Sequence, residues 1–304
     1  MTETPSAPGA QSRVCGVVVT FHPDIPALTR LLELIAPQVD SLVIVDNGSD
    51  TDLTALKATF HAQLECLGEN FGIARAQNVG IKIARDLNAS HVLLLDQDSL
   101  PAPDMVDQLI AAEQSLRAGG KKVAAVGANY VDPRQGETGS FVYRDGLRLK
   151  RRPMIAPDAI VETDFLIASG SLTPIDVFDE VGDMVDELFI DYVDIEWGLR
   201  ARAMGYLSYG VFGAHMEHAL GDDHIPIRGH RVPLHSPLRH YYQLRNAVWL
   251  IRQSWLPKVW TALLVWRMFR QFLFFTVAAP KGLKHGQMML AGIADGLRGR
   301  MGAK

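Results

Sequence analysis

The chain has 304 residues, of which 48% are apolar and 21% are charged, and its formal net charge is −4 at pH 7. This composition is typical of a folded globular protein and excludes an intrinsically disordered or fibrous chain. The two cysteines, Cys15 and Cys66, are too few for a disulfide framework or a multi-cysteine zinc site, and they fit a reducing compartment such as the cytoplasm best.

Charge is distributed unevenly along the chain. Residues 228–304 carry 13 Lys and Arg against a single acid, Asp295, for a net charge of +12, whereas the rest of the chain carries −16. This split indicates an acidic catalytic body with a basic tail that meets phosphate, in nucleic acid or in an anionic membrane. Because no zinc-finger, RNP or basic-zipper signature is present, we do not expect nucleic-acid binding.

Strands and helices alternate through the first hundred residues. We expect strands at residues 14–20, 41–45, 63–67 and 91–95, and helices at residues 25–35, 52–60 and 72–88. The alternation predicts βαβ units, and therefore a parallel sheet with right-handed crossovers. Residues 1–12 lack the basic start and apolar core of a signal peptide, so we expect a disordered leader there.

The fourth expected strand ends in Asp96-Gln97-Asp98. In an extended backbone residues i and i+2 share a face, so two carboxylates would project together at the edge where open α/β sheets bind ligands. Carboxylates this close repel each other unless a cation such as Mg²⁺ or Mn²⁺ lies between them and phosphate oxygens. An ordinary acidic turn is the alternative reading of so short a motif.

Polar residues follow the other expected strands as well. Thr20 closes the first, Asp46-Asn47 the second, and Asn70 with Gly72 follows the third. Because loops at one edge of a parallel sheet converge, these residues are expected to line one crevice. Local turn chemistry or a helix start would explain each alone, but not all together. The absence of Gly-x-Gly-x-x-Gly and Walker lysine motifs argues against a dinucleotide dehydrogenase or a P-loop enzyme.

Several motifs keep a common order and spacing between residues 14 and 252. In the first half they are Val-Val-Val-Thr-Phe-His-Pro from Val17, Val-Asp-Asn-Gly-Ser-Asp-Thr from Val45, Asn-Phe-Gly-Ile-Ala-Arg-Ala-Gln-Asn-Val-Gly from Asn70, and Leu-Asp-Gln-Asp-Ser from Leu95. This series resembles the landmarks of family 2 glycosyltransferases, which have the GT-A fold.

The second half narrows the resemblance. Its motifs are Phe-Leu-Ile-Ala-Ser-Gly-Ser from Phe165, Phe-Ile-Asp-Tyr-Val-Asp-Ile-Glu-Trp from Phe189 with Arg200, His-Ala-Leu-Gly-Asp from His218, and Tyr-Tyr-Gln-Leu-Arg-Asn from Tyr241. They are similar to bacterial rhamnosyltransferases of that family. The implied fold is α/β, with a Rossmann-like, mostly parallel sheet and flanking helices. It spans residues 13–230 (nucleotide half 13–130, acceptor half 131–230), and residues 231–304 form a basic helical extension.

The resemblance also implies roles at individual positions. Asp46 would read the pyrimidine of the donor, Asp96 would face ribose or metal, Asp98 would ligate Mg²⁺ or Mn²⁺, and His218 would complete the metal site. The implied donor-binding residues are Thr20, Phe21, Asp46, Asn47, Asn70, Gly72, Arg75, Asn78, Asp96 and Gln97.

Asp194 occupies the position of the catalytic base in the family's Glu-Asp motif, although Val193 replaces the preceding Glu. Inverting transfer needs a carboxylate near the acceptor hydroxyl and a cation on the leaving group. Asp191, expected on the same helix as Asp194, and Glu196 are alternative bases. Glu196 and Arg200 have the i, i+4 spacing of an ion pair, so we assign Glu196 a structural role. A solvated helix start would also explain this acidic segment.

Two further segments leave alternatives open. Residues 132–158 are expected to form a long excursion, either a lid over the active site or a surface loop. In residues 256–279, Arg267, Arg270 and Gln271 interrupt an apolar run, so we do not expect a transmembrane helix. That segment suits a helix lying in the membrane interface; a dimer interface or packing on the catalytic domain is the competing interpretation.

The sequence therefore predicts an inverting, metal-dependent enzyme that moves L-rhamnose from dTDP-L-rhamnose to a saccharide acceptor, which is lipid-linked if the protein binds membrane. The expected location is the cytoplasm, at the inner face of the cell membrane in the membrane-bound case. A family 2 transferase with another donor, such as a UDP-hexosamine, and a catalytically silent binding protein of the same fold are the alternatives.

Overall fold

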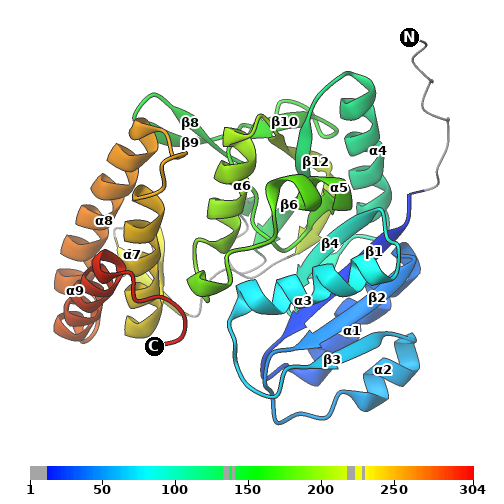
Figure 1. Cartoon of the computed structure of the whole chain (residues 1–304), viewed down its shortest axis with the longest axis horizontal. Coiled ribbons are helices and arrows are strands. Elements are labelled where there is room, and N and C mark those ends of the chain that lie inside the picture. The colour runs from blue at the N-terminus through cyan, green and yellow to red at the C-terminus, as the bar shows by residue number, and fades with distance from the viewer. Residues whose placement is uncertain (1–11, 133–136, 139–140, 218–222, 228–229) are drawn as a thin grey trace.

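The computed structural model describes residues 12–132, 137–138, 141–217, 223–227 and 230–304 (Figure 1). The first half alternates strands and helices close to the predicted bounds. Its elements are β1 (Val14–Thr20), α1 (Ile25–Ile35), the 3-10 helix η1 (Ala36–Gln38), β2 (Ser41–Asp46), α2 (Thr54–Phe60), β3 (Gln63–Cys66), α3 (Ile73–Asp86), β4 (His91–Asp96), β5 (Leu100–Pro101), α4 (Met105–Ala118) and β6 (Val123–Asp132).

The second half adds further strands and ends in three long helices. Its elements are β7 (Glu137–Thr138), β8 (Val142–Asp145), β9 (Arg148–Arg151), β10 (Ile160–Thr163), β11 (Ser171–Pro174), α5 (Ile175–Val181), the 3-10 helix η2 (Asp186–Leu188), α6 (Val193–Ala203), β12 (Leu207–Glu217), β13 (Asp223–Ile227), β14 (His230–Leu234), α7 (Pro237–Ile251), α8 (Lys258–Ala278) and α9 (Gly282–Arg298).

The central sheet is mixed. Its strand order is β10-β12-β6-β11-β4-β1-β2-β3, with β5 paired to β12 and β7 to β6. The strands β4, β1, β2 and β3 are mutually parallel, as predicted for the first half. In the second half β11 runs antiparallel between β4 and β6, and β10 runs antiparallel to β12. The sheet is thus parallel in its N-terminal part and mixed in its C-terminal part.

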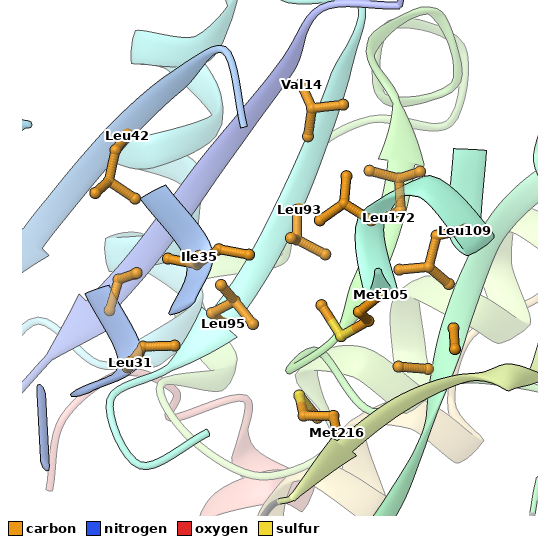
Figure 2. Packing of buried hydrophobic residues seen from close by; sticks show 14 of the residues in the cluster. Val14, Leu31, Ile35, Leu42, Leu93, Leu95, Met105, Leu109, Leu172 and Met216 are labelled. Atoms are coloured by element: carbon orange, nitrogen blue, oxygen red, sulfur yellow. The ribbon is translucent and has the colours of Figure 1, made fainter. Parts of the chain in front are cut away.

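Helices cover both faces of the sheet, which explains why the central strands are continuous apolar runs. All seven residues of β1 are buried. On one face, Leu31 and Ile35 of α1 and Met105 and Leu109 of α4 pack over Leu93 of β4 (Figure 2). The opposite face is covered by α3, α5 and α6. Because packing fixes the strands from both sides, the loops at their carboxyl ends stand on a rigid base.

The predicted excursion at residues 132–158 contains a β-hairpin, in which β8 pairs antiparallel with β9. At its base the buried Phe141 ring packs edge-on against Phe212 of β12, with 5.1 Å between ring centroids. A Cβ at Gly210 would lie 2.2 Å from the Phe141 ring, so the ring occupies the space that this glycine leaves. The hairpin is therefore anchored on the sheet.

The C-terminal extension forms a group of three helices, α7, α8 and α9, beside the domain that holds the central sheet (Figure 1). Its long helix α8 continues through Arg267, Arg270 and Gln271 without a break. Over an 18-residue window its mean hydropathy is 1.2 and only 11% of that window is buried, so α8 is long and apolar enough to cross a membrane. The expectation that this segment does not cross a membrane therefore stays a prediction.

Candidate active site

Asp46 is held rigidly at the carboxyl edge of the sheet. Its side chain is buried, and its carboxylate accepts hydrogen bonds from Thr20 Oγ1 at 2.9 Å, from the Ser49 amide at 2.8 Å and from Ser49 Oγ at 2.5 Å. Thr20 and Asp46 are register partners on β1 and β2, and Val19 is the partner of Asp96 on β4. The ends of three adjacent strands therefore place Thr20, Asp46 and Asp96 along one edge, as predicted.

Asn47 and Asn70 join the ends of β2 and β3. Asn47 Nδ2 donates to Asn70 Oδ1 at 3.1 Å, while Asn47 Oδ1 accepts from the Phe71 amide at 3.0 Å. Asn70 Oδ1 also accepts from the Gly72 amide at 2.9 Å. Both asparagines thus shape the entry to α3, a role that turn chemistry alone predicts.

Gly72 adopts φ +88°, a conformation that L side chains rarely adopt, and a Cβ there would lie 2.5 Å from Phe189 O. The next amide, of Ile73, donates to Phe189 O at 2.7 Å. Gly72 is therefore the point where the nucleotide half touches the segment that leads to Asp194.

Gln97 links the loops after β1 and β4. Its side chain accepts from the Phe21 amide at 2.8 Å and donates to Phe21 O at 3.2 Å. The Phe21 ring itself is 41% exposed, so it offers a flat surface on which a nucleobase can stack.

Arg75 and Asn78, on α3, contact the second half. Arg75 pairs with Asp186 at 3.1 Å, and Asn78 Nδ2 donates to Asp186 Oδ1 at 2.6 Å and to Met184 O at 2.9 Å. Asn78 Oδ1 accepts from the Met184 amide at 2.9 Å. The amide of Asn78 therefore fixes residues 184–186 to α3, a contact that sequence reasoning did not predict.

Asp96 and Asp98 supply two carboxylates at the end of β4 and in the turn beyond it. The Asp96 amide donates to Ser169 Oγ at 3.0 Å, which fixes the backbone at this point. Carboxylate oxygens suit Mg²⁺ and Mn²⁺, and Mg²⁺ usually takes one or two carboxylates together with substrate phosphates, so this donor set fits the expected ion. Within the described residues no cluster of three or more metal-ligating side chains occurs.

His218, the predicted third ligand, lies outside the described residues. The strand that precedes it is well placed, because Glu217 of β12 pairs with Leu100 of β5, two residues beyond Asp98. The predicted metal role of His218 stays a prediction.

Asp194 lies in the first turn of α6, and its carboxylate accepts from the Ile195 amide at 2.8 Å. Burial raises the pKa of Asp194 from 3.8 to about 6, and repulsion from the carboxylates of Asp191 and Asp96 adds to this rise. Asp194 lines a small cavity with Ala168 and Ser171, and the Asp96 amide donates to Ser169, so the end of β4 and the start of α6 lie against the same segment. A carboxylate with this pKa suits a general base at neutral pH.

Asp191 does not lie on the helix, contrary to the expectation, because α6 begins at Val193 and Asp191 has φ +65°. Its carboxylate makes a bidentate pair with Arg239 of α7, with distances of 2.7 and 2.8 Å. Gln243 also donates to it at 3.3 Å. Asp191 therefore links the segment before α6 to α7 of the C-terminal extension.

Glu196 is 1% exposed and forms a bidentate pair with Arg200, at 2.7 and 3.1 Å. Arg200 also donates to Asp183 O at 2.8 Å. The predicted i, i+4 ion pair and the structural position of Glu196 are therefore confirmed.

The motif from Tyr241 to Asn246 clamps the segment before α6. Asn246 Nδ2 donates to the carbonyl oxygens of Leu188, Ile190 and Asp191 at 2.8–2.9 Å. Fully buried Arg245 donates to the carbonyls of Glu187 and Leu188 at 3.0–3.1 Å, and Tyr242 stacks on Phe189 with 5.1 Å between centroids.

This clamp is needed because Phe189, Asp191 and Tyr192 all have positive φ. A segment in this unfavourable conformation leaves carbonyl groups that no helix or strand satisfies, and the α7 side chains satisfy them. Sequence reasoning missed this function. The signal was present, since the motif belonged to the family resemblance, but no role followed from its residue types alone.

Acidic and polar side chains at the carboxyl ends of β1, β2 and β4 are an arrangement that suits binding of a nucleotide with a divalent ion. The model of the family "Glycosyl transferase family 2" matches residues 16–164. The dTDP-rhamnosyl transferase RfbF of Shigella flexneri is 34% identical over 249 residues, which cover 81% of this chain and 82% of that protein. The chain therefore belongs to glycosyl transferase family 2 and is a glycosyltransferase.

Solved structures support the fold. The crystal structure of S. aureus TarS 1-349 superposes with a TM-score of 0.61 at 14% identity, covering 95% of this chain and 82% of TarS 1-349. A structure of GalNAc-T7 with UDP, GalNAc and Mn²⁺ gives a TM-score of 0.62 at 12% identity, covering 95% of this chain and 56% of GalNAc-T7. At these identities the likeness establishes the fold alone.

Proposed function

We propose that the protein is an inverting, metal-dependent rhamnosyltransferase that takes L-rhamnose from dTDP-L-rhamnose. The donor is supported by the identity to a protein described as a dTDP-rhamnosyl transferase over most of both chains. In this proposal Asp46 reads the thymine, and Thr20, Phe21, Asn47, Asn70, Gly72, Arg75, Asn78 and Gln97 shape the nucleoside and diphosphate site.

The observation that carries the proposed chemistry is the acid Asp194, whose pKa of about 6 reflects burial and the nearby carboxylates of Asp191 and Asp96. Ionised at neutral pH, Asp194 removes the proton from the acceptor hydroxyl as the oxygen attacks the anomeric carbon and the bond to the dTDP oxygen breaks. Asp96 and Asp98 would hold Mg²⁺ or Mn²⁺, with His218, and the ion would offset the charge that develops on the leaving diphosphate.

The proposed acceptor is a saccharide on a lipid carrier, at the cytoplasmic face of the cell membrane. The support is the tail, whose helix α8 is long, apolar and mostly exposed and whose residues 228–304 carry a net charge of +12. Anionic headgroups attract such a segment.

The test measures binding of dTDP-L-rhamnose and of UDP-GlcNAc by calorimetry, and turnover as release of the nucleoside diphosphate. We expect tight binding of dTDP-L-rhamnose only, and turnover that EDTA abolishes and Mg²⁺ or Mn²⁺ restores. Asp194→Asn is expected to lower turnover about 100- to 10,000-fold with donor affinity nearly unchanged. Ordinary turnover in that variant would remove Asp194 as the base, and preferential binding of UDP-GlcNAc would remove the rhamnosyl donor.

A further inference from the structure

A long groove runs along α8 beneath the β8–β9 hairpin, which reaches over this helix in Figure 1. It consists of two adjoining cavities of about 990 and 420 Å³. Both are lined by Leu149 of the hairpin and by Arg267 and Arg270 of α8, so they adjoin along this helix and are together called the α8 groove. Its volume is sufficient for a ligand larger than a single sugar ring.

The charged side chains that line the groove are all positive. Arg148, Arg267 and Arg270 line it, and neither cavity has an Asp or Glu among the described residues that form its walls. Arg267 and Arg270 are exposed to solvent. Because a guanidinium group matches phosphate oxygens with paired N–H donors, this arrangement is suited to a phosphate-bearing ligand.

The smaller cavity reaches the start of α6, whereas Asp194 itself lines a separate small cavity with Ala168 and Ser171. Tyr192 and Ile195, which flank Asp194 in the chain, line it together with Arg267. The Arg267 guanidinium stacks over the Tyr192 ring, 5.6 Å from its centroid. A ligand held by Arg267 therefore lies next to the helix start that carries Asp194.

An exposed apolar stripe of α8 forms part of the groove wall, because Trp266 lines the smaller cavity and Leu273 and Val277 line the larger one. Trp266, Phe269, Leu273 and Val277 are spaced by three or four residues, so they form one stripe, and each is 55–78% exposed. Trp266 and Phe269 of this stripe directly precede Arg267 and Arg270 in the sequence. A molecule with a phosphate group and a long hydrocarbon chain matches both surfaces at once.

We propose that the α8 groove is the acceptor-carrier site, in which Arg267 and Arg270 bind the phosphate of the lipid carrier. The saccharide extends past Tyr192 toward the start of α6, and the hydrocarbon chain lies along the apolar stripe. This assignment rests on the proposed function and specifies how its acceptor is recognised.

The first experiment measures binding of the full-length protein to phosphatidylcholine vesicles that contain a long-chain alkyl diphosphate. Vesicles with phosphatidylglycerol at equal surface charge serve as the comparison. We expect stronger binding to the alkyl diphosphate vesicles, and we expect Arg267→Gln and Arg270→Gln each to weaken it about 10-fold. The matched control is Lys284→Gln, which removes the same charge from exposed Lys284 of α9, outside the groove.

Each alternative occupant gives a distinct result. Equal binding to both kinds of vesicle means that the arginines respond to membrane charge, and overturns the assignment. Equal weakening by Lys284→Gln does the same. If light scattering shows that a dimer forms in wild type and is lost when Phe269 and Leu273 are both changed to Ser, a second copy covers the stripe, which also overturns it.

The second experiment separates this assignment from the proposed function. Transfer is measured to one saccharide in two forms, carried on an alkyl diphosphate and carried on an uncharged alkyl chain. We expect Arg270→Gln to raise KM about 10-fold for the diphosphate form only. A rise for both forms, or for neither, refutes phosphate recognition by the groove. Failure of the wild-type protein to release dTDP from dTDP-L-rhamnose refutes the proposed function itself.

Discussion

Replacing Asp194 with Asn is expected to make the protein more stable at pH 8 while it removes activity. Burial, with repulsion from Asp191 and Asp96, raises the pKa of Asp194 to about 6. A raised folded pKa means that the folded protein favours the protonated acid. The stabilisation from this protonation is therefore full below about pH 4, is lost as the pH rises through about 6, and is absent at pH 8.

The size of the effect follows from the same values. A folded pKa of about 6 against the ordinary 3.8 corresponds to about 3 kcal/mol. Because residue 194 as a whole is only partly buried, we expect about 2 kcal/mol. Asn is nearly isosteric and its Oδ1 can still accept from the Ile195 amide, so the substitution removes the charge with little other change.

The assay is urea unfolding of the metal-free protein at pH 4 and pH 8. Asp194→Asn should match the wild type at pH 4 and exceed it at pH 8. Asp191→Asn is the matched control, and we expect it to change stability in the opposite direction. Asp191 is paired with Arg239 at 2.7 Å, so removing its charge should lower the stability of the protein at pH 8. A pH-independent difference, or a less stable Asp194→Asn at pH 8, would refute the reasoning.

Three further substitutions test the supports of the site. Asn246→Ala should lower the free energy of unfolding by about 3 kcal/mol and also lower kcat, because three carbonyls before α6 lose their hydrogen-bond donor. An unchanged kcat would contradict the role of Asn246 in positioning Asp194. Glu196→Gln should destabilise by about 3 kcal/mol with donor KM unchanged, since it breaks a buried ion pair. Gly72→Ala should lower the free energy of unfolding in urea by more than about 2 kcal/mol, because the added Cβ would clash with Phe189 O. Gly68 also has a positive φ but has open space around it, so Gly68→Ala should lower the free energy of unfolding by less.

Local patterns in the sequence predicted the nucleotide-binding half closely. The helix Ile25–Ile35 and the strand Val14–Thr20 have the bounds expected from periodicity. The carboxyl ends of parallel strands lie at the same edge of a sheet, which predicted that Thr20, Asp46 and Asp96 share that edge. The strand register confirms this position. These features depend on neighbours in sequence and on one sheet rule, so they were accessible without coordinates.

The second half was less predictable because its contacts are distant in sequence. Asp191 was expected on a helix with Asp194, but pairing with Arg239, 48 residues away, and the clamp from Asn246 hold it in a left-handed conformation outside the helix. The helical spacing of Asp191 and Asp194 carried no information about either partner.

By itself, the sequence determined the family, the strand-end acids and the ion pair of Glu196 with Arg200, since motif order and short-range spacing encode them. Only the tertiary structure decided that α7 holds the segment before Asp194, and that α8 and the β8–β9 hairpin enclose an arginine-lined groove. The physical reason is that burial, carbonyl satisfaction and cavity shape arise between segments far apart in the chain, whereas sequence patterns report on near neighbours.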